Sequence, residues 1–277
     1  MVFAVMGGDD RFLRLTRLLR EDGHTVRTFA LEAALPDCET SPEAAATGAD
    51  CVLLPLPCEK DGALFAPLSA VRQGAAETMA AAAAPGTRVF AGRAPEPLRA
   101  LCRRRGLPLT DYLHREDFAL RNAELTAEGA LELLLQGENA LRGSHVLIAG
   151  FGRIGRRLAG KLTALGALVT VAARRPEERA LAELMGCRTL RFSETAVPAI
   201  WDAVVNTVPA PVFGTPELEA FGDARLLELA SAPFGFDPAA AEALGRKISL
   251  CSGLPGKCAP AAAAAALRDT IYAVLED

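Results

Sequence analysis

Short apolar runs alternate along this chain with stretches whose apolar residues recur at helical spacing. The first run, residues 2–6, is followed by residues 11–22, where Phe12, Leu15 and Leu19 fall on one helical face. Further strands are predicted at residues 24–29, 51–55, 87–91 and 107–110, and further helices at residues 73–84 and 98–105. Strands that alternate with helices predict a parallel sheet, and therefore an α/β fold.

The same alternation resumes in the second half of the chain. It predicts strands at residues 145–149, 167–172, 203–206, 226–229 and 248–251. Residues 126–142, which contain no proline, predict a helix that links the two halves. The alanine-rich residues 261–275 predict a terminal helix, because alanine has the highest helix propensity.

A chain of 277 residues is long enough for two domains, each with its own core. We predict two doubly wound parallel-sheet domains. They are a flavodoxin-like substrate domain at residues 1–125 and a Rossmann dinucleotide-binding domain at residues 143–257, joined by the linking helix at 126–142 and followed by a helix at 258–277 that returns to the first domain. Because ligands of open α/β sheets bind beyond the carboxyl ends of the strands, we expect the substrate in the cleft between the domains.

A G-x-G-x-x-G motif directly follows the apolar run at residues 145–149. Gly150 permits a tight turn from strand to helix, Gly152 lets the backbone approach a pyrophosphate, and Gly155 lets the helix pack closely on the strand. The pyrophosphate is expected at the positive end of the helix that starts near Arg153. An ordinary βα turn is the alternative, but the strand before the motif and the helix after it favour a dinucleotide site.

The end of the next predicted strand indicates which dinucleotide binds. An NAD site places an acidic residue roughly 20 residues past the glycines, whereas an NADP site offers arginine to the 2′-phosphate. Here no carboxylate occurs before Glu177, and Arg174 and Arg175 supply two cations. We therefore predict NADP, with NAD as the alternative cofactor and a solvated arginine pair as the non-functional interpretation.

Charge and cysteine content exclude several classes of function. The net charge is −4 and the 30 Lys and Arg residues are scattered, which argues against a nucleic-acid partner. No uncharged apolar run reaches the roughly 20 residues of a membrane span, and residues 1–8 lack a signal-peptide pattern, so we expect a cytoplasmic protein without a membrane partner. The seven cysteines include no C-x-x-C and none has a histidine at metal-ligand spacing. We expect no metal and mostly structural thiols, with a reactive Cys251 or Cys258 as the alternative.

Several segments resemble the A subunits of dipicolinate synthase. In the first half these are Met6-Gly7-Gly8-Asp9 with Arg11, Leu54-Pro55, Asp61-Gly62, Asp111-Tyr112, Arg115 to Ala119 and Thr126 to Ala130. In the second half they are Gly150 to Gly155, Ala173-Arg174, Asn206 to Pro209, Leu229 to Ser231 with Pro233, Gly253 to Lys257 and Ala259-Pro260. The chain departs from the resemblance at Ala261 and Ala262, where related chains often carry polar residues such as Lys-Thr. A substrate role for that pair is therefore in doubt in this chain.

The resemblance implies a sporulation enzyme that oxidises a dihydropyridine dicarboxylate, or the hydroxylated tetrahydro ring that dehydrates to it, with a hydride passing to NADP. It also implies a partner, a flavoprotein-like B subunit, and the mother cell of a sporulating bacterium as the location. Because the ring gains aromaticity, the protein need only orient the ring and hold two carboxylates. The sequence leaves open whether the chain forms a homo-oligomer.

This chemistry selects candidate residues for each role. Besides the three glycines and the two arginines, the cofactor candidates are Phe151, Arg153, Ile154, Ala173, Asn206, Thr207, Val208, Pro209 and Ser231. The candidates for binding a dicarboxylate are Arg11, Arg93, Arg115, Glu128, Gly253, Leu254, Pro255, Gly256 and Lys257. The catalytic candidates are His114 as proton acceptor, Ser231 and Lys257. For Glu128 the alternative is to stabilise the start of the linking helix, and for each arginine it is a surface charge.

Three other functions compete with this interpretation. A D-2-hydroxyacid dehydrogenase shares the two-domain plan but needs a late histidine, and none follows His145. An enzyme of the shikimate dehydrogenase type would need a Lys and Asp pair in the first domain, where Lys60 and Asp61 are merely adjacent in sequence. A non-catalytic scaffold or sensor protein would bind NADP without turning over.

Overall fold

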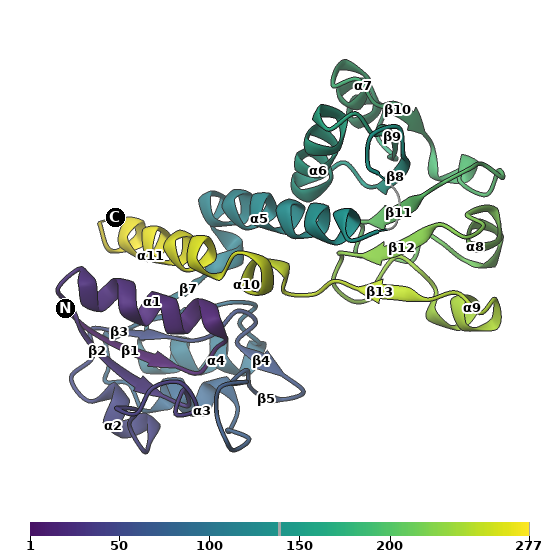
Figure 1. Ribbon diagram of the computed structural model, residues 1–277. Helices are drawn as coiled ribbons and strands as arrows, with labels where there is room; N and C mark the ends of the chain where they lie inside the picture. The colour runs from purple at the N-terminus through teal and green to yellow at the C-terminus, as the bar shows by residue number, and fades with distance from the viewer. Residues whose placement is uncertain (138–139, 277) are drawn as a thin grey trace. The chain divides into compact units, whose positions relative to one another are not determined.

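The computed structural model describes residues 1–137 and 140–276, which form two compact units. The first unit consists of Met1–Asn122 and Ala259–Asp277, and the second of Ala123–Cys258. Each unit has its own parallel sheet with apolar packing on both faces (Figure 1). The prediction of an α/β fold with two doubly wound parallel sheets is confirmed.

The sheet of the first unit has the strand order β2-β1-β3-β6-β7, and every neighbouring pair is parallel. Its strands are β1 (Val2–Met6), β2 (Thr25–Phe29), β3 (Cys51–Leu53), β6 (Arg88–Ala91) and β7 (Leu109–Asp111). The order reverses between β1 and β3, as in flavodoxin-like folds. The loops after these two strands therefore diverge, and they open the carboxyl edge of the sheet.

Helices cover both faces of this sheet because its strands are apolar on both sides. Phe3 and Val5 face α1 and α11, whereas Ala4 and Met6 face the opposite layer. The helices are α1 (Asp10–Glu21), α2 (Pro42–Ala46), α3 (Ala76–Ala81), α4 (Glu96–Arg105) and α11 (Pro260–Glu276). The unit also holds a small antiparallel hairpin, β4 (Glu59–Lys60) with β5 (Ala63–Leu64), and a 3-10 turn at Tyr112–His114.

The terminal helix α11 packs on α1 and contributes to the core of the first unit. The hydroxyl of Tyr272 donates a 2.7 Å hydrogen bond to the carboxylate of Asp22. The guanidinium of Arg88 donates to the carbonyl oxygen of Val274 at 2.7 Å. Polar contacts thus join α11 both to the end of α1 and to strand β6.

The sheet of the second unit has the order β10-β9-β8-β11-β12-β13, again with every neighbouring pair parallel. Its strands are β8 (His145–Ala149), β9 (Leu168–Ala172), β10 (Arg188–Leu190), β11 (Ala203–Asn206), β12 (Arg225–Glu228) and β13 (Ile248–Leu250). In order of sequence this is 3-2-1-4-5-6, the order of the dinucleotide-binding Rossmann sheet. The strand order reverses between β8 and β11, so ligands are expected where these two strands end.

The helices of the second unit complete its two outer layers. They are α5 (Glu116–Leu135), α6 (Arg153–Ala164), α7 (Pro176–Leu184), α8 (Thr215–Ala220), α9 (Pro238–Ala243) and α10 (Leu254–Cys258), with a 3-10 turn at Phe192–Glu194. The boundary between the two units falls within α5. No helix in the described part of the chain is long and apolar enough to cross a membrane.

Two predicted helices have wrong boundaries. The linking helix, predicted at residues 126–142, is α5, which starts ten residues earlier at Glu116 because residues 116–125 contain neither glycine nor proline. The helix predicted at 73–84 is shorter in the structure, where α3 spans Ala76–Ala81. The amide of Leu64 in the hairpin donates a hydrogen bond to the carbonyl oxygen of Gly74, which keeps Gly74 outside the helix. In both cases the first residue of the helix depends on features other than the spacing of apolar residues.

Candidate functional site

The glycine motif connects β8 to α6 in a turn that larger residues would not fit. Gly150 has a φ of +89°, and a Cβ there would lie 2.6 Å from the hydroxyl of Thr207. A Cβ on Gly155 would lie 2.2 Å from the carbonyl oxygen of Gly150. These two glycines are therefore needed for packing of helix against strand.

Gly152 is different, because no atom of the protein lies within 4 Å of the position its Cβ would take. Its φ of −78° is one that any residue adopts. Gly152 also caps the N-terminus of α6, a helix of 12 residues, without a side-chain hydrogen bond. Packing does not require this glycine, but a pyrophosphate approaching the end of α6 would. The residues present thus fit a dinucleotide.

Thr207, which directly follows strand β11, lies beside this turn. The hydroxyl of Thr207 donates to the carbonyl oxygen of Ala149 at 2.7 Å, and its amide donates to the same oxygen at 3.0 Å. Thr207 therefore fixes the end of β11 against the end of β8. Of the other motif residues, Phe151 is buried in the core, so its backbone rather than its ring is available to a ligand.

The turn after β9 carries the arginine pair. Ala173 is buried, whereas Arg174 and Arg175 are exposed. Arg175 is paired with Glu178 and Glu177, and the hydrogen bond that it donates to Glu178 raises its pKa. The guanidinium of Arg174 makes no hydrogen bond or ion pair to any other described residue. Of the two cations, Arg174 is the one left for a phosphate.

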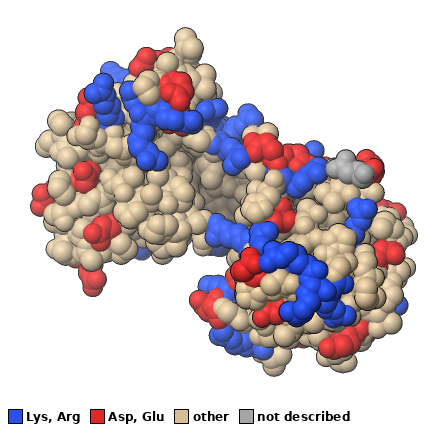
Figure 2. Space-filling model, turned by 180° about the vertical axis from the view of Figure 1, so that it is seen from behind, with Lys and Arg blue, Asp and Glu red and all other residues tan. Residues whose placement is uncertain are grey.

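The turn itself is held by a third arginine. Arg179 donates from Nη1 to the carbonyl oxygens of Ala173 and Arg174, each at 2.8 Å. Lys and Arg side chains gather on the part of the second unit that carries α6 and α7 (Figure 2), and among the exposed ones are Arg153, Arg156, Arg157 and Arg174. This end of the unit is thus suited to an anionic ligand.

A buried amide and a buried carboxylate join the loops that follow β11 and β12. Asn206 is fully buried and donates from Nδ2 to the Glu228 carboxylate at 2.6 Å and to the carbonyl oxygen of Val208 at 2.9 Å. Asn206 was a cofactor candidate, but its partner Glu228 was not among the candidates. The only signal in the sequence is a glutamate that follows two leucines of a buried strand.

The next candidates are Ser231, which follows β12, and residues 253–257, which follow β13. Ser231 lies half-buried in the loop after β12, and its carbonyl oxygen accepts from the amide of Phe234 at 3.1 Å. Most of the candidate segment at residues 253–257 lies in the short helix α10, and the amides of Gly256 and Lys257 both donate to the carbonyl oxygen of Gly253. Those amides are therefore not available to a substrate carboxylate, and Leu254 and Pro255 are buried. The side chain of Lys257 remains exposed.

In the first unit, Arg11 follows the turn after β1 but does not face solvent. It is 4% exposed, and its guanidinium binds the carboxylate of Asp9 and the carbonyl oxygen of Leu56. Asp9 in turn caps α1. The expected role of Arg11 in binding a dicarboxylate does not fit this placement, because its donors already hold two loops of the sheet edge together.

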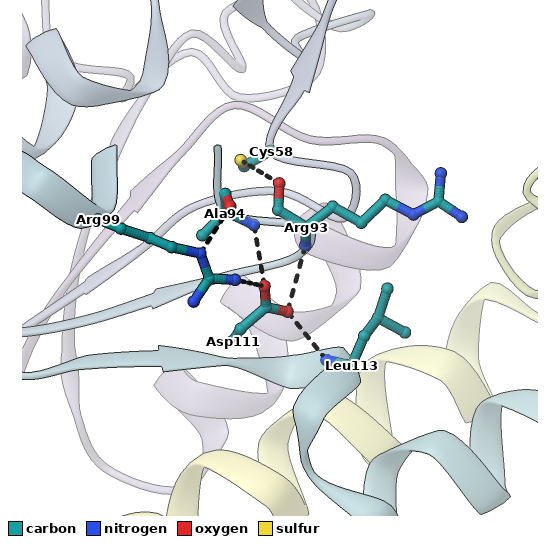
Figure 3. A network of polar contacts seen from close by, with 6 residues as sticks. All are labelled: Cys58, Arg93, Ala94, Arg99, Asp111 and Leu113. Atoms are coloured by element: carbon teal, nitrogen blue, oxygen red, sulfur yellow. Dashed lines mark hydrogen bonds and ion pairs between the residues drawn. The ribbon is translucent and has the colours of Figure 1, made fainter. Parts of the chain in front are cut away.

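Arg93 follows β6 and is held by its backbone (Figure 3). The buried carboxylate of Asp111 accepts hydrogen bonds from the amides of Arg93 at 3.2 Å, Ala94 at 2.9 Å and Leu113 at 3.1 Å. Arg99 donates to the same carboxylate at 2.8 Å. The side chain of Arg93 extends away from this network, and its φ of 55° is one that L-residues rarely adopt.

The other candidates lie on the outside of the units. His114 ends the 3-10 turn and is exposed. Arg115 pairs with Asp117. Burial opposes the charge on Asp117, but the hydrogen bonds from Arg115 and from backbone amides together outweigh burial and lower the carboxyl pKa. The alternative role of Glu128, stabilising the start of the linking helix, is wrong, because α5 begins twelve residues earlier. Glu128 is exposed and pairs with Lys161 at 3.2 Å.

The cysteine thiols are poor nucleophiles in this structure. All seven are free, and burial raises the pKa of Cys251. The pKa of Cys258 is also raised, by burial and by its hydrogen bond with Glu132. Because the thiolate is the reactive form, neither residue is prepared for nucleophilic chemistry.

A pocket of about 510 Å³ lies between α9 and β13 in the second unit. Phe234, Phe236, Ile248 and Leu250 line much of it. The volume is that of a small-molecule site, but the lining includes no residue of the glycine motif or of α6. This pocket is therefore not the dinucleotide site, although Glu228 contributes to its wall.

Comparison with known families separates the two halves of the chain. Residues 2–113 match the family described as the N-terminal domain of the dipicolinate synthase A subunit. Residues 117–228 match the family described as D-isomer specific 2-hydroxyacid dehydrogenase, NAD binding domain. The second unit is thus an NAD(P)-binding domain. The D-2-hydroxyacid match covers this domain alone, and the chain has no histidine after His145.

Individual relatives agree with the N-terminal match. The dipicolinate synthase A subunit of Bacillus subtilis (strain 168) is 32% identical over 193 residues, which are 68% of this chain and 65% of that protein. The match therefore spans just under two thirds of the relative's length.

Solved structures extend the likeness to the whole chain. The dipicolinate synthase A subunit from Bacillus halodurans has a TM-score of 0.87 at 27% identity, covering 100% of this chain and 98% of that one. The corresponding protein from Bacillus subtilis has a TM-score of 0.84 at 25% identity, covering 100% and 96%. Transhydrogenase from Sinorhizobium meliloti, with a TM-score of 0.69 at 16% identity, covers 99% of this chain and 93% of that one and shares the fold.

Two alanine substitutions in the glycine motif should affect different properties, one the affinity for the dinucleotide and the other the stability of the fold. Gly152→Ala should fold with a free energy of unfolding close to that of the wild type, because its Cβ meets no protein atom, yet it should weaken nicotinamide dinucleotide binding by about 10-fold or more. Gly155→Ala should lower the free energy of unfolding by about 1–3 kcal/mol, because its Cβ meets the backbone of Gly150. Thermal unfolding and binding titration measure both effects. Equal loss of stability in the two variants would contradict this assignment of Gly152.

Proposed function

Because the chain belongs to the family of dipicolinate synthase A subunits, we propose that it is an NADP-dependent dehydrogenase that forms dipicolinate. The substrate is dihydrodipicolinate or the hydroxylated tetrahydro precursor that dehydrates to it. The observation that carries the dehydrogenase assignment is the turn from β8 to α6, where Gly152 faces open space at an uncapped helix end. The family match of residues 2–113 supports the substrate class.

The reaction removes a hydride and a proton from the ring, which becomes aromatic. When bound, the nicotinamide accepts the hydride. The amides at the start of α6 bind the pyrophosphate, and Thr207 keeps the end of β11 in place beside them. The side chains therefore act by binding and orientation, which is sufficient because the gain of aromaticity drives the step.

NADP is proposed over NAD because of Arg174. It is exposed at the end of β9, the position at which this fold places the ribose 2′ substituent, and the glutamates of the next helix pair with Arg175 instead. A guanidinium can bind a 2′-phosphate with two hydrogen bonds. NAD is the alternative cofactor.

For the two carboxylates of the substrate, we favour Arg93 among the three candidate arginines. Arg11 is buried, and its guanidinium binds Asp9 and the carbonyl oxygen of Leu56. Arg93 is exposed at the carboxyl end of a central strand, where open parallel sheets bind ligands. Lys257, Ser231 and His114 are the remaining candidates for substrate binding and for proton transfer.

A second polypeptide belongs to the same proposal. The relatives are named as A subunits, which supports a partner subunit for this chain. We propose that this partner is a flavoprotein-like B subunit and that the two work in the cytoplasm of a sporulating cell. A chain that binds NADP and turns over only with that partner would be a scaffold rather than a complete enzyme. An enzyme of the shikimate dehydrogenase type is not favoured, because Lys60 and Asp61 lie exposed in the β4–β5 hairpin.

The proposed activity predicts the joint appearance of two products. Dihydrodipicolinate is generated from pyruvate and aspartate semialdehyde by its synthase, and the purified chain is added with NADP. We expect NADPH and dipicolinate in equal amounts, followed by absorbance and chromatography. NADP binding with no turnover in both assays, that of the chain alone and that of the chain together with its B subunit, would refute the substrate assignment.

Arg174→Ala should weaken NADP binding by about 10- to 100-fold, because a hydrogen bond to a charged group contributes about 1.5–3 kcal/mol. Binding of NAD should be unchanged, because it has no 2′-phosphate. Arg175→Ala is the matched control and should have a smaller effect, since Arg175 is already paired. Calorimetric titration of both cofactors into the three proteins measures this. An unchanged preference in Arg174→Ala would remove the basis for NADP.

Arg93→Gly should leave the free energy of unfolding within about 1 kcal/mol of the wild type, because glycine adopts a positive φ readily. Loss of the guanidinium should weaken dipicolinate binding by about 10- to 100-fold. Asp61→Gly is the matched control, since Asp61 is also exposed and has a φ of 54°. It should bind dipicolinate normally. Wild-type affinity in Arg93→Gly, measured by calorimetry, would show that another residue binds the carboxylate.

A further inference from the structure

Glu228, at the end of β12, is a buried carboxylate surrounded by donors. It is 1% exposed. One oxygen accepts from Asn206 Nδ2 at 2.6 Å and from the amide of Ala230 at 2.9 Å. The other accepts from the amides of Gly235 at 2.8 Å and Phe236 at 3.3 Å. No ion pair among the described residues involves Glu228, so backbone and amide N–H groups alone balance it.

The same contacts clamp two loops that are distant in sequence. Asn206 holds the loop after β11, because its amide also donates to the carbonyl oxygen of Val208 and its Oδ1 accepts from the Val208 amide at 3.0 Å. The amides bound by Glu228 belong to the loop after β12. The two loops meet closely: a Cβ on Gly235 would lie 2.3 Å from the side chain of Asn206. Neither loop can move without breaking this network.

The strand order places these loops relative to a dinucleotide. The pyrophosphate belongs at the β8–α6 turn and the adenosine 2′ position at the end of β9, on one side of β8. The nicotinamide half then falls on the other side, over the ends of β11 and β12. Those are the ends that Asn206 and Glu228 join.

We propose that Glu228 is a positioning residue that fixes the loops after β11 and β12 in the shape that receives the nicotinamide half of the cofactor. This inference rests on the cofactor-binding part of the proposed function. A carboxylate is required because four donors and no acceptor face it. In glutamine the side-chain NH₂ would confront two of those donors and leave them unpaired.

The test separates the two halves of the cofactor. Binding of NADPH and of 2′-phospho-ADP-ribose, which lacks nicotinamide, is measured for the wild type and for Glu228→Gln. We expect NADPH to bind about 10- to 100-fold more weakly to the variant, with the affinity for 2′-phospho-ADP-ribose unchanged. NADH and ADP-ribose are measured in parallel, so a chain that prefers NAD tests the inference equally.

Two further variants keep the result interpretable. Asp202→Asn is the matched control, because Asp202 accepts from the amide of His145 at 2.8 Å before β11, at the opposite edge of the same sheet. It should not distinguish NADPH from the fragment. Gly235→Ala pushes the loop away from Asn206 without altering Glu228, and it should reproduce the selective loss even where Glu228→Gln does not fold.

Each outcome has one meaning. A loss confined to the nicotinamide-containing ligands in Glu228→Gln or Gly235→Ala supports the inference. Equal weakening of dinucleotide and fragment, or no weakening of either, overturns it. Failure of the wild type to bind any of the four ligands would instead overturn the proposed cofactor function, so the two failures are distinguishable.

Discussion

The close approach of helix α6 to the end of strand β8 is the contact on which the second unit depends. The carbonyl oxygen of Gly150 occupies the space that a side chain at Gly155 would need. Because Gly155 has no side chain, the start of α6 packs closely against the turn at the end of β8. The direction of its N–H groups, and with it the affinity for an anion, follows from that packing.

Both units solve the same physical problem at the carboxyl edge of their sheets. Loops that leave buried parallel strands carry backbone N–H groups that the ladder does not satisfy. In the first unit Asp111 accepts from three such amides, and in the second Glu228 accepts from three as well. Each buried carboxylate therefore shapes the loops around it: Asp111 holds the backbone of Arg93, and Glu228 joins the loops after β11 and β12.

The cationic residues divide in a similar way into structural and available ones. Arg11 and Arg179 use their guanidinium groups to bind loop carbonyl oxygens, and Arg175 is paired with glutamates. Arg174 and Lys257 keep exposed charges. Residue type alone does not separate these groups, because an arginine that binds a carbonyl oxygen and one that awaits an anion look the same in a sequence.

Features that are local could be read from the sequence alone. Apolar runs of strand length, the helical repeats between them and the spacing of Gly150, Gly152 and Gly155 predicted the parallel sheets and the dinucleotide turn, because each depends on residues within a few positions of one another. Whatever depends on partners far along the chain was settled by the fold. Glu228 acts on Asn206, 22 residues away, and the carbonyl oxygen of Leu56 binds Arg11, 45 residues away. The short helix α10, which contains Lys257, likewise became visible only in the structure. A buried polar group takes its role from whichever atoms the fold brings to it, and no periodicity in the sequence records those atoms.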